Sequence, residues 1–208
     1  MADFESTFTG RGNINGGHRE DGYLTGQFLI AMPSMEDGRF SKTVIYMCAH
    51  SDDGAMGLVI NKRMPSLEAS DLLEQLGIDD PSRPDALHIH FGGPVESGRG
   101  FVLHSADFMR EGSLIVDEAL ADGVALTATL DILRAIADGR GPRDHILALG
   151  YAGWGPGQLD EEIQSNGWLH VEADPAILFD RDLSTKWERA IGKLGFDPAH
   201  LTTHSGHA

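Results

Sequence analysis

The order of strand and helix signals along the chain constrains the fold more than any other feature of the sequence. Two pairs of β-type segments come early: 42–50 with 56–61, and 86–93 with 100–105. A turn rich in Gly or Asp separates the members of each pair, which predicts two β-hairpins. Helical segments are mixed in afterwards and do not alternate strictly with strands. This order predicts an α+β fold and argues against a doubly wound parallel sheet.

The remaining segments complete this prediction. A short apolar run at 27–32 is closed by Pro33, and strands are expected at 113–120, 145–153 and 168–174. Residues 124–139 change from strand character to helical spacing. Further helices are expected at 67–76, 157–167 and 182–195, and Thr129 is a candidate cap for the helix within 124–139. The sequence shows no internal repeat and no long linker. We therefore expect a flexible N-terminal arm over 1–22 and a single domain over 23–208.

Charge and composition exclude several classes of function. Sixteen Lys and Arg against 32 Asp and Glu give the 208-residue chain a net charge of −16, which excludes a generally basic nucleic-acid binder. The same balance disfavours an anionic membrane surface as partner, and no apolar run reaches the roughly 18 residues of a membrane-spanning helix. Residues 1–22 lack the apolar segment of a secretory signal, so we expect a cytoplasmic protein in which the single cysteine, Cys48, is a reduced thiol.

Long blocks of the sequence resemble the AlgH-like (YqgE-like) family of bacterial proteins. The matching blocks lie at 26–50, 54–62, 91–105 and 148–169, with KWERAIGKLG near the end, so the resemblance covers roughly 23 to 208. It implies a complex mixed sheet, branched and curled into a barrel-like shape and flanked by helices, in a cytosolic protein. The family carries a transcriptional-regulator label and brings no established catalytic residues. Ala49 departs from the family pattern, which often has Glu there, so a site that depends on that carboxylate is in doubt here.

Cys48 and His50 form the first candidate site. Alternate residues of a strand share one face, so the thiol and the imidazole are expected to meet. A protonated histidine lowers the pKa of a neighbouring thiol and makes it reactive, which predicts a redox site. The alternative is a small buried hydrophobe beside a polar residue at the end of the strand.

Histidines form a second pattern. His88 and His90 share one face of a predicted strand, and His104 lies on its predicted partner, an arrangement that suits zinc. The sequence indicates no fourth ligand, so we expect strand histidines and no metal site. His200, His204 and His207 lie in the tail, where histidines bind metal adventitiously.

A glycine-rich stretch gives the third candidate site, because it joins a predicted strand to a predicted helix start, where free backbone N–H groups suit a phosphate or carboxylate. The candidate ligand-binding residues there are Gly150, Gly153, Trp154, Gly155 and Gly157. Arg99, in the predicted hairpin loop, is a candidate clamp for the same small anion. The alternative is structural: glycines that adopt positive φ, and Arg99 paired with Glu96. Three acidic residues at 160–162 would also repel an anion.

Three functional hypotheses follow, in this order. The first is a non-enzymatic regulatory or interaction module that acts through a protein partner without reading DNA directly. The second is a protein that binds a small ligand or senses redox state. The third is an unrecognised thiol- or metal-dependent enzyme. No catalytic residue and no cofactor are assigned, because the sequence holds no GxSxG, HExxH or EF-hand pattern.

Overall fold

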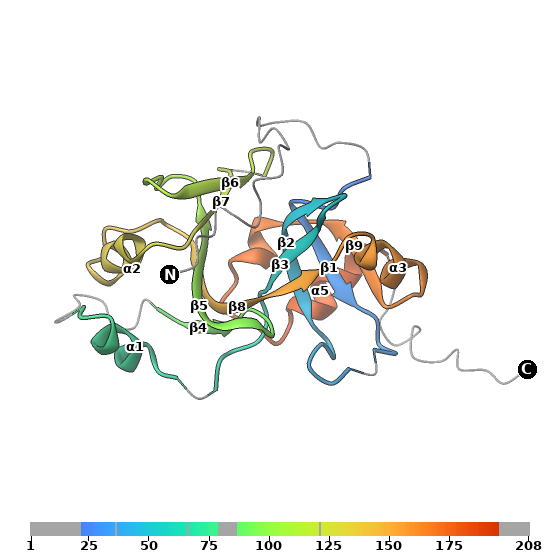
Figure 1. Cartoon of the computed structure of the whole chain (residues 1–208), viewed down its shortest axis with the longest axis horizontal. Coiled ribbons are helices and arrows are strands. Elements are labelled where there is room, and N and C mark those ends of the chain that lie inside the picture. The colour runs from blue at the N-terminus through green and yellow to red at the C-terminus, as the bar shows by residue number, and fades with distance from the viewer. Residues whose placement is uncertain (1–21, 36, 66, 79–86, 121, 196–208) are drawn as a thin grey trace, which may run out of the picture.

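The computed structural model describes residues 22–35, 37–65, 67–78, 87–120 and 122–195 (Figure 1). The predicted arm through residue 21 and the tail residues His200, His204 and His207 lie outside these ranges. The strands are β1 (Gln27–Ala31), β2 (Val44–Ser51), β3 (Gly54–Val59), β4 (Ile89–Phe91), β5 (Val95–Ser105), β6 (Ser113–Asp117), β7 (Val124–Thr127), β8 (His145–Trp154) and β9 (Trp168–Glu172). The helices are α1 (Ala69–Gln75), α2 (Leu130–Ala137), α3 (Gln158–Gln164), α4 (Pro175–Leu178) and α5 (Lys186–Gly192).

All nine strands of the described residues belong to one curled sheet with helices around it, so the predicted α+β class and the curled mixed sheet are confirmed. The strand order is β6-β7-β5-β8-β3-β2-β1-β9, and β4 pairs in parallel with β8 beside this path. The long strands β5 and β8 run through the middle of the sheet, with α1 and α2 on one side of the molecule and α3 on the other (Figure 1). Within the described residues, no helix is long and apolar enough to cross a bilayer.

The first predicted hairpin is present. Strands β2 and β3 pair antiparallel from Ile45 opposite Val59 to Ser51 opposite Gly54, with a tight turn between them. Both faces of β2 are covered: Val44 and Tyr46 pack into one core cluster, whereas Ile45 packs into another. A strand that is buried on both faces reads as a continuous apolar run, which explains the sequence VIYMCA.

The second predicted hairpin is wrong. Strands β4 and β5 do not pair with each other, because β8 lies between them, parallel to β4 and antiparallel to β5. The sheet branches here, since β4 and β3 pair with successive parts of β8. The connection from β4 to β5 crosses β8 so closely that a Cβ atom at Gly93, where φ is +153°, would lie 2.0 Å from the carbonyl carbon of Tyr151. Glycine is therefore required at the branch point.

The helices follow the predicted order with shorter bounds. Thr129 occupies the N-cap position of α2, but its side chain makes no capping hydrogen bond. The sequence analysis missed α4, a single turn whose N-cap Asp174 accepts a hydrogen bond from the Ala176 N–H at 2.9 Å. Helix α5 is attached to the sheet by the Trp187 indole, which donates to the Ala31 carbonyl at 2.9 Å. The segment between α4 and α5 is thereby held against the sheet.

Candidate functional site

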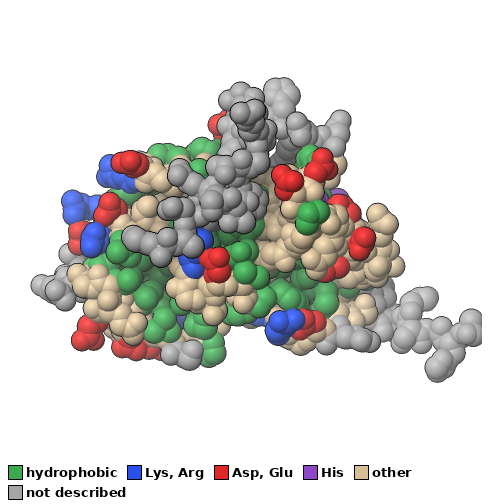
Figure 2. Space-filling model, viewed as in Figure 1, with side chains coloured by type: hydrophobic (Ala, Val, Ile, Leu, Met, Phe, Trp, Pro, Cys, Tyr) green, Lys and Arg blue, Asp and Glu red, His purple; other side chains and the backbone are tan. Residues whose placement is uncertain are grey.

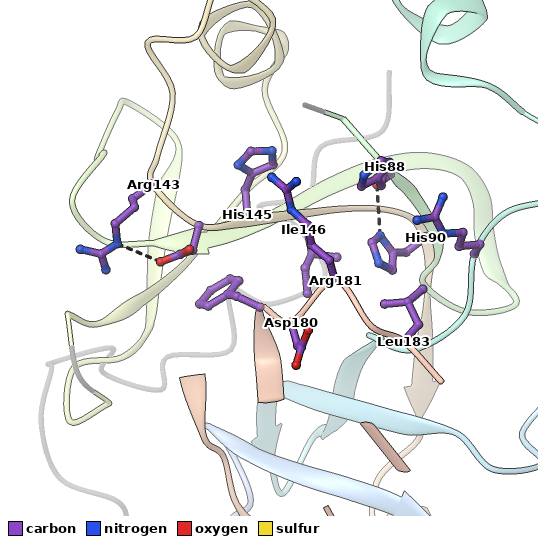
Figure 3. Close-up of a pocket in the computed structure, with 11 residues that line it drawn as sticks. His88, His90, Arg143, His145, Ile146, Asp180, Arg181 and Leu183 are labelled. Atoms are coloured by element: carbon purple, nitrogen blue, oxygen red, sulfur yellow. Dashed lines mark hydrogen bonds and ion pairs between the residues drawn. The ribbon is translucent and has the colours of Figure 1, made fainter. Parts of the chain in front are cut away.

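A small hollow lies where β4, the start of β8 and the segment between α4 and α5 meet (Figure 3). Its cavity volume is about 70 Å³. Pockets for drug-sized ligands are roughly 300 Å³ or more, so this one suits a small ion or a single functional group of a larger molecule. The lining residues are Arg63, His88, His90, Arg143, Asp144, His145, Ile146, Phe179, Asp180, Arg181 and Leu183.

Cationic and imidazole side chains dominate this lining, although the chain as a whole carries a net charge of −16. On the face that Figure 2 shows, acidic side chains are scattered over the surface and basic ones occur at a few places. The three lining arginines come from three separate segments: Arg63 after β3, Arg143 before β8, and Arg181 between α4 and α5. The fold therefore concentrates positive charge that the sequence spreads over more than a hundred residues.

The two acidic residues of the lining already have partners. The Asp144 carboxylate accepts from Arg143 Nε at 2.9 Å, and the Asp180 carboxylate pairs with Arg189 of α5. Among the residues that the structure describes, no ion pair or side-chain hydrogen bond engages Arg63 or Arg181. These two guanidinium groups can thus take an anion without breaking a contact to a carboxylate. An arginine without an acidic partner is the side chain best suited to bind a carboxylate or phosphate, because its guanidinium can donate two parallel hydrogen bonds to two oxygens of the anion.

The buried imidazole of His90 is held in its neutral form. Its Nδ1 lies 3.1 Å from the His88 carbonyl oxygen and 3.3 Å from that of Leu147, so Nδ1 carries the proton and donates. Burial lowers the pKa of His90 to about 4, and the nearby charge of Lys186 acts in the same direction. His90 is therefore uncharged at neutral pH and leaves Nε2 as an acceptor.

The structure separates His104 from His88 and His90. His104 lies opposite His145 on one edge of β8, whereas His90 lies opposite Ala148 on the other. Both ring nitrogens of His104 are engaged, Nδ1 with the Ser105 carbonyl and Nε2 with the Thr127 hydroxyl, each at 2.9 Å. Nowhere in the described part of the chain do three or more His, Cys, Asp or Glu side chains form a group that could hold a metal ion.

Cys48 and His50 do not share a face, because a β-bulge between Met47 and Ala49 interrupts the pairing of β2 with β3. Cys48 and the next residue, Ala49, both pack against the same core cluster, so the alternation shifts by one residue. His50 lies on the other face, where its Nδ1 accepts from the Leu24 N–H at 3.2 Å. Burial raises the pKa of the Cys48 thiol to about 12. The expected geometry is thus wrong at this pair, and a redox role for Cys48 and His50 stays a prediction.

The glycine-rich stretch has mostly structural contacts. The Gly150 backbone, at φ +71°, passes so close to the connection between β4 and β5 that a Cβ atom would lie 2.4 Å from the Gly93 carbonyl oxygen. Gly153 pairs with Met56 of β3, and Trp154 is 8% exposed. The indole of Trp154 donates to Glu162 Oε2 at 2.9 Å, and the Trp168 indole donates to the same oxygen at 2.8 Å. This carboxylate on α3 therefore ties β8 to β9.

The other members of this predicted site lie on the surface. Gly155 is exposed and donates its N–H to Gln158, and Gly157 is the left-handed N-cap of α3. Arg99 donates to the Glu96 carboxylate at 2.9 Å and lies over the Phe101 ring at 5.2 Å. The structure does not bring Arg99 or the glycines to the hollow described above. Anion binding by this loop stays a prediction.

Comparison with known proteins gives the family. The AlgH-like family model matches residues 28–199, most of the chain. The chain belongs to the AlgH-like family. AlgH-like relatives include a UPF0301 protein of Nitrobacter hamburgensis, 54% identical over 92% of this chain and 91% of its own length. A UPF0301 protein of Bradyrhizobium diazoefficiens is 53% identical over 90% of this chain and 89% of its own.

Solved structures agree with the AlgH-like fold. The solution structure of AlgH from Pseudomonas aeruginosa aligns with a TM-score of 0.74 at 42% identity, covering 93% of this chain and all of that one. The crystal structure of a protein from Corynebacterium diphtheriae aligns with a TM-score of 0.67 at 19% identity, covering 89% and 95%. At that identity the second likeness shows the fold alone.

Sequence reasoning missed most of the hollow. Only the alternation of His88 and His90 pointed to it, and that pattern predicts strand histidines without a metal site. The other basic and imidazole side chains that line the hollow come from separate segments of the sequence: Arg63, Arg143, His145 and Arg181. No local motif joins them, because the fold brings them together only through the parallel pairing of β4 with β8.

Proposed function

We propose that this protein is a non-enzymatic binding module whose hollow recognises a small anionic group. One observation carries the proposal: Arg63 and Arg181, which have no acidic partner among the described residues, line the same small cavity in a protein with a net charge of −16. Guanidinium groups from separate segments can approach an anion from different directions. The neutral His90 adds a polar group with an acceptor nitrogen to the same wall.

Thermal unfolding in the presence of inorganic phosphate and sulfate tests this proposal. A ligand that binds only the folded state adds about 2.7 kcal/mol of stability at a concentration of about 100 Kd. We expect the stabilisation to disappear in Arg63→Ala and Arg181→Ala. Arg134→Ala is the matched control, since it removes one positive charge from an exposed arginine on α2 that pairs with Asp131. Equal stabilisation of all four proteins would contradict the proposal.

A regulatory or interaction module that binds a protein partner is the second candidate function. Strand β6 ends the sheet, so one of its edges pairs with no other strand of the described chain. Leu114 on β6 is 42% exposed, and Met109 and Leu130 are also exposed. Unpaired strand edges beside apolar side chains favour the addition of a partner strand. A cytoplasmic setting belongs to this proposal, because the single cysteine leaves no internal disulfide.

Cross-linking in the native host tests the second candidate. A partner that is recovered with the wild-type protein and lost with Leu114→Lys would support it. Gln75→Lys is the control, because it adds the same charge at an exposed position on α1. Equal recovery of the partner with both variants would contradict a role for the β6 edge.

A further inference from the structure

Lys186 is the most unusual charged residue of the described chain. It lies in the first turn of α5, and its side chain is fully buried. Its Nζ donates to the Leu178 carbonyl at 2.7 Å and to the Ile60 carbonyl at 3.2 Å. Both acceptors are neutral backbone groups, and no salt bridge is formed by Lys186 among the described residues. A buried cation normally pairs with an anion, so its charge here is not neutralised by direct contact.

The ammonium group is hydrogen-bonded to backbone next to the hollow, because its acceptors Leu178 and Ile60 precede the lining residues Phe179 and Arg63 by one and three positions. Its charge lowers the pKa of His90 on β4 and contributes to lowering that of Asp180, and both residues line the cavity. Leu178, which accepts its shorter hydrogen bond, stands two residues before Asp180. The ionic groups around Lys186 are therefore Asp180 and Arg189, which pair with each other, together with the neutral His90. Since Asp180 and Arg189 offset each other, the charge of Lys186 leaves these groups with a net positive charge beside the cavity.

We infer that Lys186 makes the hollow selective for a dianionic phosphate-type group over a monoanionic carboxylate, an inference that rests on the anion-binding function proposed above. The attraction between a fixed charge and a ligand grows in proportion to the ligand's charge, and a buried charge is screened less than an exposed one. Lys186 acts at a distance, because its Nζ is occupied by carbonyls and does not line the cavity. It is a specificity-determining residue that does not touch the ligand.

The shape of the hollow agrees with a phosphate-type ligand. Phosphate presents several oxygens in a tetrahedral arrangement, whereas a carboxylate presents two in a plane. The guanidinium groups of Arg63 and Arg181 reach the cavity from different elements, so they can bind different oxygens of one phosphate. A cavity of about 70 Å³ accommodates such a headgroup, with any organic remainder at the open mouth. The ligand class is therefore a small molecule with a terminal phosphate.

Calorimetric titration of the full-length protein with sodium sulfate, sodium phosphate and sodium acetate tests the inference. Sulfate is the main probe because it remains dianionic from about pH 6 to pH 10. We expect wild-type protein to bind sulfate and phosphate at least about tenfold more tightly than acetate. Lys186→Met keeps the length of the side chain and removes its charge. We expect this variant to lose about tenfold in sulfate affinity and much less in acetate affinity.

The pH dependence of sulfate binding gives a measurement that needs no variant. Burial lowers the pKa of Lys186 to about 8, Arg189 acts in the same direction and Asp180 opposes both. Arginine does not titrate below about pH 12, and His90 is already neutral. His88 and His145 also line the cavity, and histidine side chains ordinarily change charge near pH 6.5, so the comparison starts at about pH 7.5. Sulfate affinity of the wild-type protein should fall between about pH 7.5 and pH 9.5, whereas that of Lys186→Met should stay flat over this range. If Lys186→Met fails to fold, the wild-type profile decides the question.

The outcomes separate this inference from the proposed function. In one outcome, Arg181→Ala abolishes sulfate binding, whereas Lys186→Met and high pH leave it unchanged. That outcome would overturn the role of Lys186 and leave the anion site intact. Acetate binding as tight as sulfate binding would overturn the dianion selectivity. Failure of the wild-type protein to bind any of the three anions would overturn the proposed function itself.

Discussion

Replacing Glu162 with alanine tests whether one carboxylate joins β8 to β9, as the structure indicates. Glu162 Oε2 accepts from the indoles of Trp154 and Trp168, which are 8% and 3% exposed. A hydrogen bond to a charged acceptor contributes about 1.5–3 kcal/mol net, and an orphaned buried donor costs a similar amount. Two such bonds predict a loss of about 3–6 kcal/mol in Glu162→Ala. This loss is a large part of the free energy of unfolding of a typical domain, which is about 5–15 kcal/mol.

Urea unfolding at neutral pH, followed by far-UV circular dichroism and tryptophan fluorescence, measures this loss. Glu162→Gln keeps a side-chain oxygen that can accept from both indoles, so we expect it to lose only about 1 kcal/mol. Glu161→Ala is the matched control, since Glu161 is exposed in the same helix and should change stability by less than about 1 kcal/mol. A loss below about 1 kcal/mol in Glu162→Ala would refute the argument, because both indole donors would then find other partners.

Three further predictions follow from burial and close backbone contact. Cys48 should resist alkylation at about pH 8 in the folded protein and react quickly in urea, since burial raises its pKa to about 12; rapid labelling without denaturant would contradict this. Gly93→Ala should prevent or severely weaken folding, whereas Gly98→Ala, where an added Cβ meets nothing within 4 Å, should leave the melting temperature nearly unchanged. Burial lowers the pKa of His90 in the folded protein from 6.5 to about 4, so the unfolded chain takes up the proton at a higher pH than the folded protein does. The stability that the neutral imidazole contributes is therefore lost as the pH falls from about 6.5 to about 4. The difference in free energy of unfolding between wild type and His90→Gln should therefore shrink by about 3 kcal/mol from pH 7 to pH 4. A difference that stays constant over this range would contradict the conclusion that His90 is buried in its neutral form.

Local patterns in the sequence predicted the local parts of the fold. The β2–β3 hairpin was predictable because its two strands are neighbours in the chain and a short turn with Asp and Gly joins them. The same logic failed for 86–105, because β8 inserts between β4 and β5 from about forty residues further along. Nothing within 86–105 signals that insertion except the paired glycines at Gly92 and Gly93. The reason for glycine at both positions, the close approach of the β8 backbone, is apparent only in the folded structure.

The candidate site was less predictable than the fold. The pairing of Cys48 with His50 assumed strict alternation, and a bulge of one residue reversed it. Trp154 in the glycine-rich stretch was a predicted ligand-binding residue, yet its indole N–H donates a hydrogen bond to Glu162. The hollow itself combines residues from distant segments, including Arg63 and Arg181, and such a combination has no signature in a single sequence.

The place of β8 in the sheet has a consequence for how the chain is made. Strands β3, β4 and β5 are all synthesised before residue 145, but each needs β8 as a neighbour. A nascent chain that has not yet reached β8 therefore leaves the ribosome with unpaired strand edges, the kind of surface that promotes aggregation. Closing the sheet also requires pairing between residues far apart in the sequence, which slows folding. Newly made chains should depend on chaperones until the strand after residue 145 has emerged.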